Sequence, residues 1–270
     1  MNNTCRRLLF LFTTCFLLHT VNAQLPTRLS EKTFNYFLNN EFRISVRPAI
    51  ARKAKVASNE IYKPGASNFI SLGAGIDYYC HFSEYFSLIT GLHGLWHGSN
   101  FNFFVPGTSF QPDLGFDLIE KGRTSGALQN GLISLQSTLE KRWFSKKERI
   151  WSTGLGLALN YSPNTTYDND YYVVRNGAWV NYAWMGYDGD NQSRPFLSAH
   201  AMAGRYWKIG KANFLVTNLV LDFSFRYFSQ GSYSFHIPGK PVVTGEYKID
   251  GSYLGLDISY CFSKNKKRMI

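Results

Sequence analysis

The stretch Phe214–Phe228, FLVTNLVLDFSFRYF, alternates between two kinds of side chain. From Leu215 onward, every second residue except Thr217 is apolar or aromatic. The other register contains the polar and charged residues Asn218, Asp222, Ser224 and Arg226. A period of two indicates a β-strand with two unlike faces. In a soluble protein the apolar face covers a core, whereas in an outer-membrane barrel it meets lipid and the polar face lines the lumen.

The N-terminal residues indicate an exported protein. Arg6 and Arg7 give a positive start, and Leu8–Leu18 is a short apolar run. This run is shorter than the roughly 20 residues that a membrane-spanning helix needs. Small residues around Ala23 form a cleavage site, so residues 1–23 are predicted to be a secretory signal peptide.

Composition and charge narrow the function classes. Aromatic residues make up 17% of the chain, which favours a β-protein, and the net charge is +11. A chain this basic could bind nucleic acid, but export argues against that partner and favours outer-membrane lipid and lipopolysaccharide. The alternation places Cys80 with apolar and Cys261 with polar neighbours, so we expect no disulfide between them.

Eight stretches of the chain show the same two-residue period. They are Phe42–Ala51, Ile70–Phe82, Phe86–Phe104, Leu132–Phe144, Ile150–Tyr161, Phe196–Trp207, Phe214–Phe228 and Gly251–Phe262. Each has about the 9–11 residues, or more, that a tilted membrane-spanning strand requires. Pro48 in the first stretch predicts a weakened strand or a bulge.

The connections between these stretches alternate strictly in length. The short ones follow at Ser83, Ser145 and Ile209. The long ones cover residues 54–69, 105–131, 162–195 and 229–250. Short turns at one rim and long loops at the other are typical of outer-membrane barrels, and a soluble sandwich has no reason to keep this parity. We therefore predict an all-β fold: an eight-stranded antiparallel transmembrane β-barrel with short periplasmic turns and long extracellular loops.

The chain resembles the outer-membrane β-barrel domain family, of the small eight-stranded type, over roughly residues 41–262. The resemblance rests on GSYLGLDISYCF at Gly251–Phe262, on the hairpin ISLGAGIDYYCHF-SEY-FSLITGLHG, and on ISLQSTLEKRWF. It implies that the barrel assembly machinery recognises the closing strand through its terminal aromatic residues, here Tyr260 and Phe262. The tail SKNKKRMI departs from members that end at this strand.

The predicted organisation has four parts in a protein of the Gram-negative cell outer membrane. Residues 1–23 are the signal peptide, 24–40 a periplasmic segment, 41–262 the barrel and 263–270 a basic tail.

The inward register contains four positive and four negative side chains. They are Arg43, Arg47, Asp77, Glu140, Arg142, Asp222, Arg226 and Asp257. The strand order allows Asp77 and Asp257 each to meet Arg43 or Arg47. Because eight strands enclose just enough space for side chains, and buried charges require partners, we predict a filled, salt-bridged lumen. A small pore is the alternative.

Candidate chemical sites in the predicted barrel are weak. His93 and His97 share a face but lie about 13 Å apart along a strand, and with His81 they make a poor zinc site. Ser198 and His200 also share a face, so a lipid-modifying outer-membrane enzyme is a rival hypothesis. A soluble lipocalin-like binding barrel is another, which the inward charges oppose. We expect no enzymatic activity, no catalytic or metal-binding residues and no cofactor.

The connection over residues 162–195 is rich in Tyr and Trp, mixed with Asn, Asp and Gly. This composition suits recognition, because rigid aromatic surfaces combine with adaptable hydrogen bonding. The aromatic residues could equally pack as a lid over the barrel mouth. The predicted function is a structural, adhesive or envelope-assembly role, with an extracellular ligand or an envelope protein as the partner of the 163–195 loop.

Overall fold

The computed structural model describes residues 40–57, 62, 64–110, 114–115, 117–120, 127–145, 149–163, 167–187, 194–209 and 213–263. The predicted signal peptide, nearly all of the predicted periplasmic segment and the tail from residue 264 lie outside the described residues. Among the residues described, no helix is both long and apolar enough to cross a membrane.

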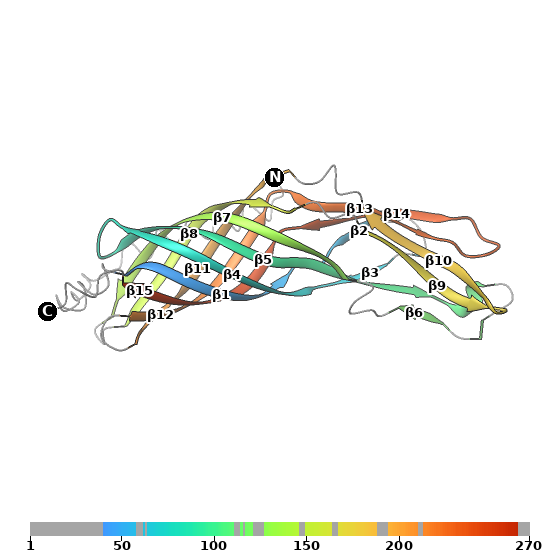
Figure 1. The fold of residues 1–270 in the computed structure, drawn as a ribbon, viewed down its shortest axis with the longest axis horizontal. Coiled ribbons are helices and arrows are strands. Elements are labelled where there is room, and N and C mark those ends of the chain that lie inside the picture. Colours follow the sequence, from blue (N-terminus) through green and yellow to red (C-terminus); the bar gives the residue numbers. More distant parts are fainter. Residues whose placement is uncertain are drawn as a thin grey trace.

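Eight antiparallel strands close into a barrel (Figure 1). They are β1 (Asn40–Ala51), β4 (Phe69–His81), β5 (Phe86–Val105), β7 (Ala127–Phe144), β8 (Ile150–Tyr161), β11 (Phe196–Ile209), β12 (Asn213–Ser224) and β15 (Tyr253–Ser263). Strands consecutive in this order pair with each other, and β1 pairs with β15 to complete the ring. The prediction of an eight-stranded antiparallel barrel is therefore confirmed.

The alternation of the sequence becomes an alternation of faces in the wall. Along β12, Asn218, Val220 and Asp222 are buried inside the barrel, while Leu219 and Leu221 are about half exposed on the outside. The same inside-outside pattern runs along β4 and β8. A period of two produces it, because successive side chains of a strand point to opposite faces.

Pro48 does not interrupt the first barrel strand. β1 continues through it, and the register with β15 is the same for Val46–Ile258 and Ala49–Gly255. The predicted bulge at Pro48 is therefore not observed, but Arg47 and Pro48 have no partners in the β1–β15 pairing, which agrees with a local weakening of that pairing. The one shift in this pairing lies at the other end of the strand, between Asn40 and Phe42.

The seventh predicted strand ends earlier than its alternation suggests. β12 stops at Ser224, and the chain bends at Phe225 and Arg226. The Ser224 hydroxyl donates to the Arg226 carbonyl at 2.6 Å, which holds the bend. Arg226 is consequently exposed, and its assignment to the lumen is wrong. Alternation alone could not locate this bend, since Phe225 to Phe228 continue the pattern.

A second sheet of five strands occupies connections that were predicted to be loops. Its order is β2 (Lys55–Ala57), β14 (Val243–Asp250), β13 (Tyr227–Phe235), β10 (Ala178–Tyr187) and β9 (Tyr167–Arg175). Short elements β3 (Gly65–Ser67), η1 (Gly107–Ser109) and β6 (Leu118–Glu120) lie in the other long connections. Figure 1 shows this sheet beyond the barrel, at the end opposite the short turns. We call it the extracellular sheet.

The extracellular sheet packs over the extended end of β5 with an apolar core. The Phe103 ring lies 4.3 Å from that of Tyr171, and the Phe101 ring lies 5.1 Å from that of Tyr247. Other fully buried members of this core are Val105, Tyr182, Met185, Tyr233, Phe235 and Ile249. Burial of this much aromatic surface stabilises the sheet as a folded unit.

Aromatic side chains lie between the lumen and the extracellular sheet. The Phe228 ring stacks 6.2 Å from that of Phe196 and meets the His97 ring edge-on at 5.1 Å. All three side chains are buried. Of the aromatic residues in the 162–195 connection, Tyr171 and Tyr182 are buried in the core of the extracellular sheet, whereas Tyr172 and Trp179 are exposed.

Candidate functional site in the lumen and on the extracellular sheet

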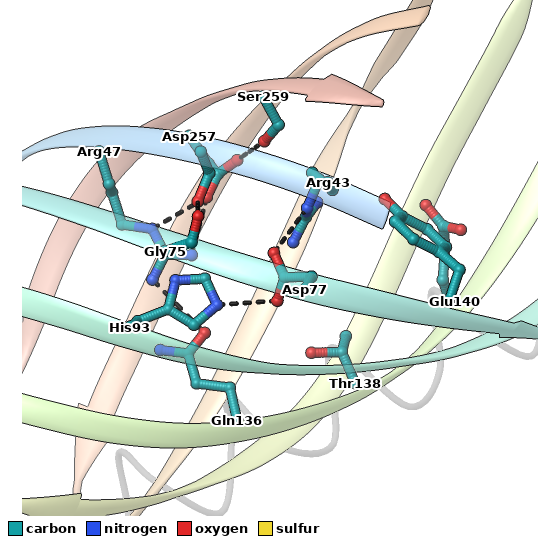
Figure 2. A network of polar contacts seen from close by, with 12 residues as sticks. Arg43, Arg47, Gly75, Asp77, His93, Gln136, Thr138, Glu140, Asp257 and Ser259 are labelled. Atoms are coloured by element: carbon teal, nitrogen blue, oxygen red, sulfur yellow. Dashed lines mark hydrogen bonds and ion pairs between the residues drawn. The ribbon is translucent and has the colours of Figure 1, made fainter. Parts of the chain in front are cut away.

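Two arginine–aspartate pairs occupy the middle of the lumen (Figure 2). Arg43 Nε donates to Asp77 Oδ2 at 2.7 Å, across the β1–β4 pairing. Arg47 donates to Asp257 Oδ2 through Nη2 at 2.8 Å and Nε at 3.1 Å, across the β1–β15 pairing. All four side chains are almost completely buried. The predicted meeting of these arginines and aspartates is confirmed, and each of these four buried charges has an opposite partner. Asp222 is also buried but is in no ion pair among the described residues, and it accepts a hydrogen bond from Ser198 Oγ.

Further polar groups extend this network across the barrel. His93 Nε2 lies 2.8 Å from Asp77 Oδ1, and the Tyr253 hydroxyl accepts a hydrogen bond from Arg47 Nη1 at 2.8 Å. Ser259 donates a hydrogen bond to Asp257 from the same strand. Gln136 on β7 lies beside His93 (Figure 2), and its Oε1 accepts a hydrogen bond from Arg47 Nη1 at 3.5 Å. The additional bonds satisfy oxygens that the arginines leave free, which a buried ion pair needs to be stable.

A second cluster ties the barrel wall to a periplasmic turn. Glu140 accepts a hydrogen bond from the Tyr206 hydroxyl at 2.6 Å and one from Arg142 Nη1 at 3.4 Å. Arg142 also donates to the carbonyl oxygens of Ser83 and Glu84, at 3.0 and 3.1 Å. This arginine therefore joins β7 to the turn between β4 and β5.

Two small cavities lie in the lumen. One of about 10 Å³ is bordered by Arg43, His200 and Asn218, together with both aspartates of the network. Arg43 Nη1, His200 Nδ1 and both amide atoms of Asn218 have no hydrogen-bond partner among the described residues. A polar cavity of this volume suits a single water molecule, which would satisfy these groups. A second cavity of about 10 Å³ lies beside His93 and Ser134.

Ser198 and His200 do not contact each other as a nucleophile and base would. Ser198 Oγ donates to Asp222 Oδ2 at 3.2 Å and accepts from Asn160 Nδ2 at 2.9 Å. His200 Nε2 instead lies 2.5 Å from Thr138 Oγ1. A hydroxyl is activated when its base is within hydrogen-bonding reach, and here the serine and the histidine have separate partners.

The other candidate ligands for a metal are dispersed. His81 Nδ1 lies 2.6 Å from Ser87 Oγ, His93 binds Asp77, and His97 packs against Phe228. Among the described residues, no three His, Cys, Asp or Glu side chains are arranged to hold one ion. Cys80 is exposed on the outer wall and Cys261 is buried inside, on opposite faces as predicted.

The β9–β10 hairpin presents an aromatic and acidic outer face. Asn176 and Gly177 turn the chain with φ angles of 50° and 76°, both in the left-handed region that two-residue hairpins favour. Trp179 is 74% exposed and lies opposite Val174, which is also exposed. Tyr172 is exposed too and meets Trp179 edge-on, with ring centroids 6.4 Å apart. We call this surface the hairpin face.

Two carboxylates complete the hairpin face. Asp170 accepts a hydrogen bond from Asn181 Nδ2 at 2.5 Å, and Asp168 accepts one from the Trp184 indole. Each carboxylate has a second oxygen with further acceptor capacity. The hairpin face therefore combines flat apolar rings with fixed hydrogen-bonding groups.

A tyrosine bridge joins two connections beside the extracellular sheet. The Tyr62 hydroxyl donates to Ser109 Oγ at 2.9 Å and accepts from Lys240 Nζ at 3.1 Å. The Ser109 hydroxyl and the Lys240 ammonium lower the pKa of Tyr62, because each can donate a hydrogen bond to the phenolate form.

Comparisons with known proteins concern the fold. No family model and no curated protein sequence matches the chain. It is similar to the outer membrane protein OprG from Pseudomonas aeruginosa, with 10% identity and a TM-score of 0.38 over 83% of this chain and 96% of that one. Neisserial surface protein A gives 11% identity and a TM-score of 0.35, over 82% of this chain and 97% of that one. The β domain of the Bordetella autotransporter BrkA gives 11% and 0.28, with 83% and 99% covered.

These TM-scores are too low to assign the fold, so the assignment rests on the geometry of the barrel itself. Its outward register exposes a continuous belt of Leu, Ile, Val and aromatic side chains, while its interior contains buried ion pairs. Only hydrocarbon suits such an exterior on a closed barrel with a polar inside. The fold is that of a small outer-membrane β-barrel.

The hairpin face is the functional feature that sequence analysis located only in part. The aromatic composition of residues 162–195 pointed to recognition, but the alternation within Tyr167–Arg175 was not used. Its even-numbered residues are Asp168, Asp170, Tyr172 and Val174, all exposed, and that period identifies a strand with one outer face.

Proposed function

We propose that this outer-membrane barrel is a non-enzymatic surface-recognition protein, in which a closed membrane part carries the extracellular sheet. The ligand class we propose is a polyhydroxylated one, the glycans of a neighbouring cell surface. The observation that carries the proposal is the hairpin face, where Trp179 and Tyr172 are exposed beside two aspartates.

The chemistry of the hairpin face supports a saccharide. The C–H face of a pyranose ring stacks on exposed indole and phenol rings, which offer rigid apolar area at low entropic cost. Asp170, Asp168 and Asn181 are positioned to exchange hydrogen bonds with sugar hydroxyls. Two carboxylates oppose anionic ligands, so we expect neutral or amino sugars.

The membrane part supports an anchoring role. Its buried ion pairs lie in the lumen, and the two cavities of about 10 Å³ beside them have space for a single water molecule each, which supports a closed barrel. The separate partners of Ser198 and His200 favour a non-enzymatic role. We also propose that the barrel assembly machinery inserts the chain through β15, and that lipopolysaccharide surrounds the outer rim.

Glycan binding by the purified full-length protein in detergent micelles tests this proposal. We expect binding to a neutral or amino glycan on an array, lost in a Trp179→Ala, Tyr172→Ala double variant. Val242→Ala is the matched control, because Val242 is 55% exposed elsewhere on the extracellular part. Absence of glycan binding by the wild type, or equal binding by the double variant, would contradict the proposal.

Two further measurements separate the rival functions. Planar bilayers containing the wild type should show no steady conductance, and a large stable current would place a pore first. Lipid A isolated from cells should be unchanged by Ser198→Ala or His200→Ala. A change caused by either substitution would replace the recognition role with a lipid-modifying enzyme.

A further inference from the structure

A bulge in β10 shapes the hairpin face. The β9–β10 register shifts between Asn181 and Ala183, so Tyr182 is an additional residue in this strand. Tyr182 and Ala183 are consequently both buried, while Asn181 and Trp184 both reach carboxylates of the outer face. In a regular strand, residues three positions apart would point to opposite faces. Bulges re-aim side chains in this way and are frequent beside functional sites.

The bulge supplies one hydrogen-bond donor to each carboxylate of the hairpin face. Asn181 precedes the bulge and donates to Asp170 Oδ1 at 2.5 Å, and the Trp184 indole follows it and donates to Asp168 Oδ1. Both carboxylates are exposed and lie two residues apart on the same side of β9. The Oδ2 atom of each can accept further hydrogen bonds. Two oriented anions are therefore adjacent on one surface.

The two carboxylates give the hairpin face a negative potential. Among the described residues, neither Asp168 nor Asp170 is in an ion pair. Local desolvation and the Asp170 and Asp168 carboxylates raise the pKa of Tyr172, because each disfavours the phenolate form. A cationic group on a ligand would offset the repulsion between the carboxylates, so charge complementarity favours a ligand that carries one.

The aromatic and acidic parts of the hairpin face follow one another along the hairpin. The Tyr172 ring meets that of Trp179 at 6.4 Å, and Asp170 is the next residue on the same side of β9. Trp179 pairs with Val174, four residues from Asp170, so about 13 Å of strand lies between the indole position and that carboxylate. This distance exceeds the length of one pyranose ring. A sugar ligand that covers both parts is therefore an oligosaccharide.

We propose that the hairpin face selects oligosaccharides with free amino groups, a specificity that rests on its proposed role in glycan recognition. One pyranose ring stacks on Trp179, and the ammonium group of a nearby ring donates charge-assisted hydrogen bonds to Asp170 and Asp168. Exposed aromatic faces also attract an ammonium group. N-acetylation removes the positive charge, so the acetylated form of the same glycan loses these contacts.

Binding of two glycan hexamers to the purified full-length protein in detergent micelles tests this specificity. The probes are the hexamers of glucosamine and of N-acetylglucosamine, which differ only at their amino groups. At about pH 6 the carboxylates are ionised and the free amines are protonated. We expect the glucosamine hexamer to bind roughly tenfold more tightly, because charge-assisted hydrogen bonds are stronger than neutral ones.

Three variants separate charge from stacking. An Asp168→Asn, Asp170→Asn variant should bind the two hexamers within about twofold of each other, since Asn keeps an acceptor oxygen and removes the charge. Trp179→Ala should weaken binding of both hexamers. Glu246→Gln is the matched control, because it removes an exposed carboxylate from β14 of the same sheet, and it should keep the preference of the wild type.

Equal binding of the two hexamers by the wild type would overturn this specificity and leave glycan recognition intact, a result that needs no variant to fold. The specificity is also wrong if the folded Asn variant keeps the preference, or if hexalysine binds as tightly as the glucosamine hexamer. If neither hexamer binds but another glycan on an array does, only the specificity fails. If no glycan binds, the proposed recognition role fails with it.

Discussion

The strands of the barrel and of the extracellular sheet share the same two-residue period, but their exposed faces meet different solvents. In the barrel the buried register is polar, with Arg43, Arg47, Asp77 and Asp257 inside and Leu221 outside. In the extracellular sheet the buried register is apolar, with Tyr171, Met185 and Phe235 inside and Asp170 outside. In both regions the alternation defines the two faces of a strand, whereas the surrounding lipid or water determines which kind of face is buried.

The two regions also depend on different forces. Burial of the polar lumen side chains removes little apolar surface from solvent, so the stability of the lumen depends on pairing its charges. The extracellular sheet is surrounded by water, and burial of aromatic surface stabilises it. Substitutions that remove a charge and substitutions that remove apolar volume should therefore act in different places.

The largest effect is expected for Asp257→Ala in the lumen. It leaves Arg47 buried without its carboxylate and should lower the free energy of unfolding by about 3–5 kcal/mol. Urea titration of the protein in lipid vesicles measures this. Glu246→Ala, which removes a 68% exposed side chain from the extracellular sheet, should change stability by less than about 0.5 kcal/mol. If the two substitutions lower the free energy of unfolding equally, the ion pairs do not stabilise the lumen.

A comparable effect, confined to the extracellular sheet, is expected for Phe235→Ala. Phe235 is fully buried, with its ring 5.8 Å from Phe103 and 6.0 Å from Tyr233. The cavity left behind should cost the sheet about 3–5 kcal/mol. Hydrogen exchange should rise in β10, β13 and β14 while the barrel strands stay protected. Uniform loss of protection would show that the sheet and the barrel unfold as one unit.

A smaller loss of stability should show directly which exposed faces meet lipid and which meet water. Leu221→Arg places a charge on the lipid-facing wall near mid-strand and should cost about 2–4 kcal/mol in vesicles. Val174→Arg changes a similarly exposed residue on the hairpin face and should cost less than about 0.5 kcal/mol. If Leu221→Arg folds in lipid as well as the wild type, this face does not meet hydrocarbon.

The smallest effect on stability is expected for a single cysteine placed at a turn. In a background without Cys80 and Cys261, Asn176→Cys at the tip of the hairpin should react with an impermeant maleimide in intact cells. Arg149→Cys, at a short turn, should react only after the outer membrane is opened. The reverse labelling would invert the proposed orientation.

Much of the barrel could be predicted from the sequence, because each of its strands carries a long regular alternation. That Asp77 and Asp257 would each meet Arg43 or Arg47 followed from the strand order, while the structure decided that Arg43 pairs with Asp77 and Arg47 with Asp257. The position of Arg226 was wrong, because a local serine hydrogen bond ends the strand at Ser224 without disturbing the alternation. The five strands of the extracellular sheet were missed. β9–β10 and β13–β14 pair as hairpins close in sequence, but the pairing of β10 with β13 and of β14 with β2 joins connections that are distant in sequence.

The sequence by itself determined the two-residue period, the alternation of short and long connections, and the two unlike faces of each barrel strand. These properties depend only on the order of residues along the chain. Only the tertiary structure decided which residues of the long connections pair, and that Tyr172 and Trp179 face outward while Tyr171 and Tyr182 fill a core. Burial and proximity depend on contacts between distant segments, which no local pattern of residues specifies.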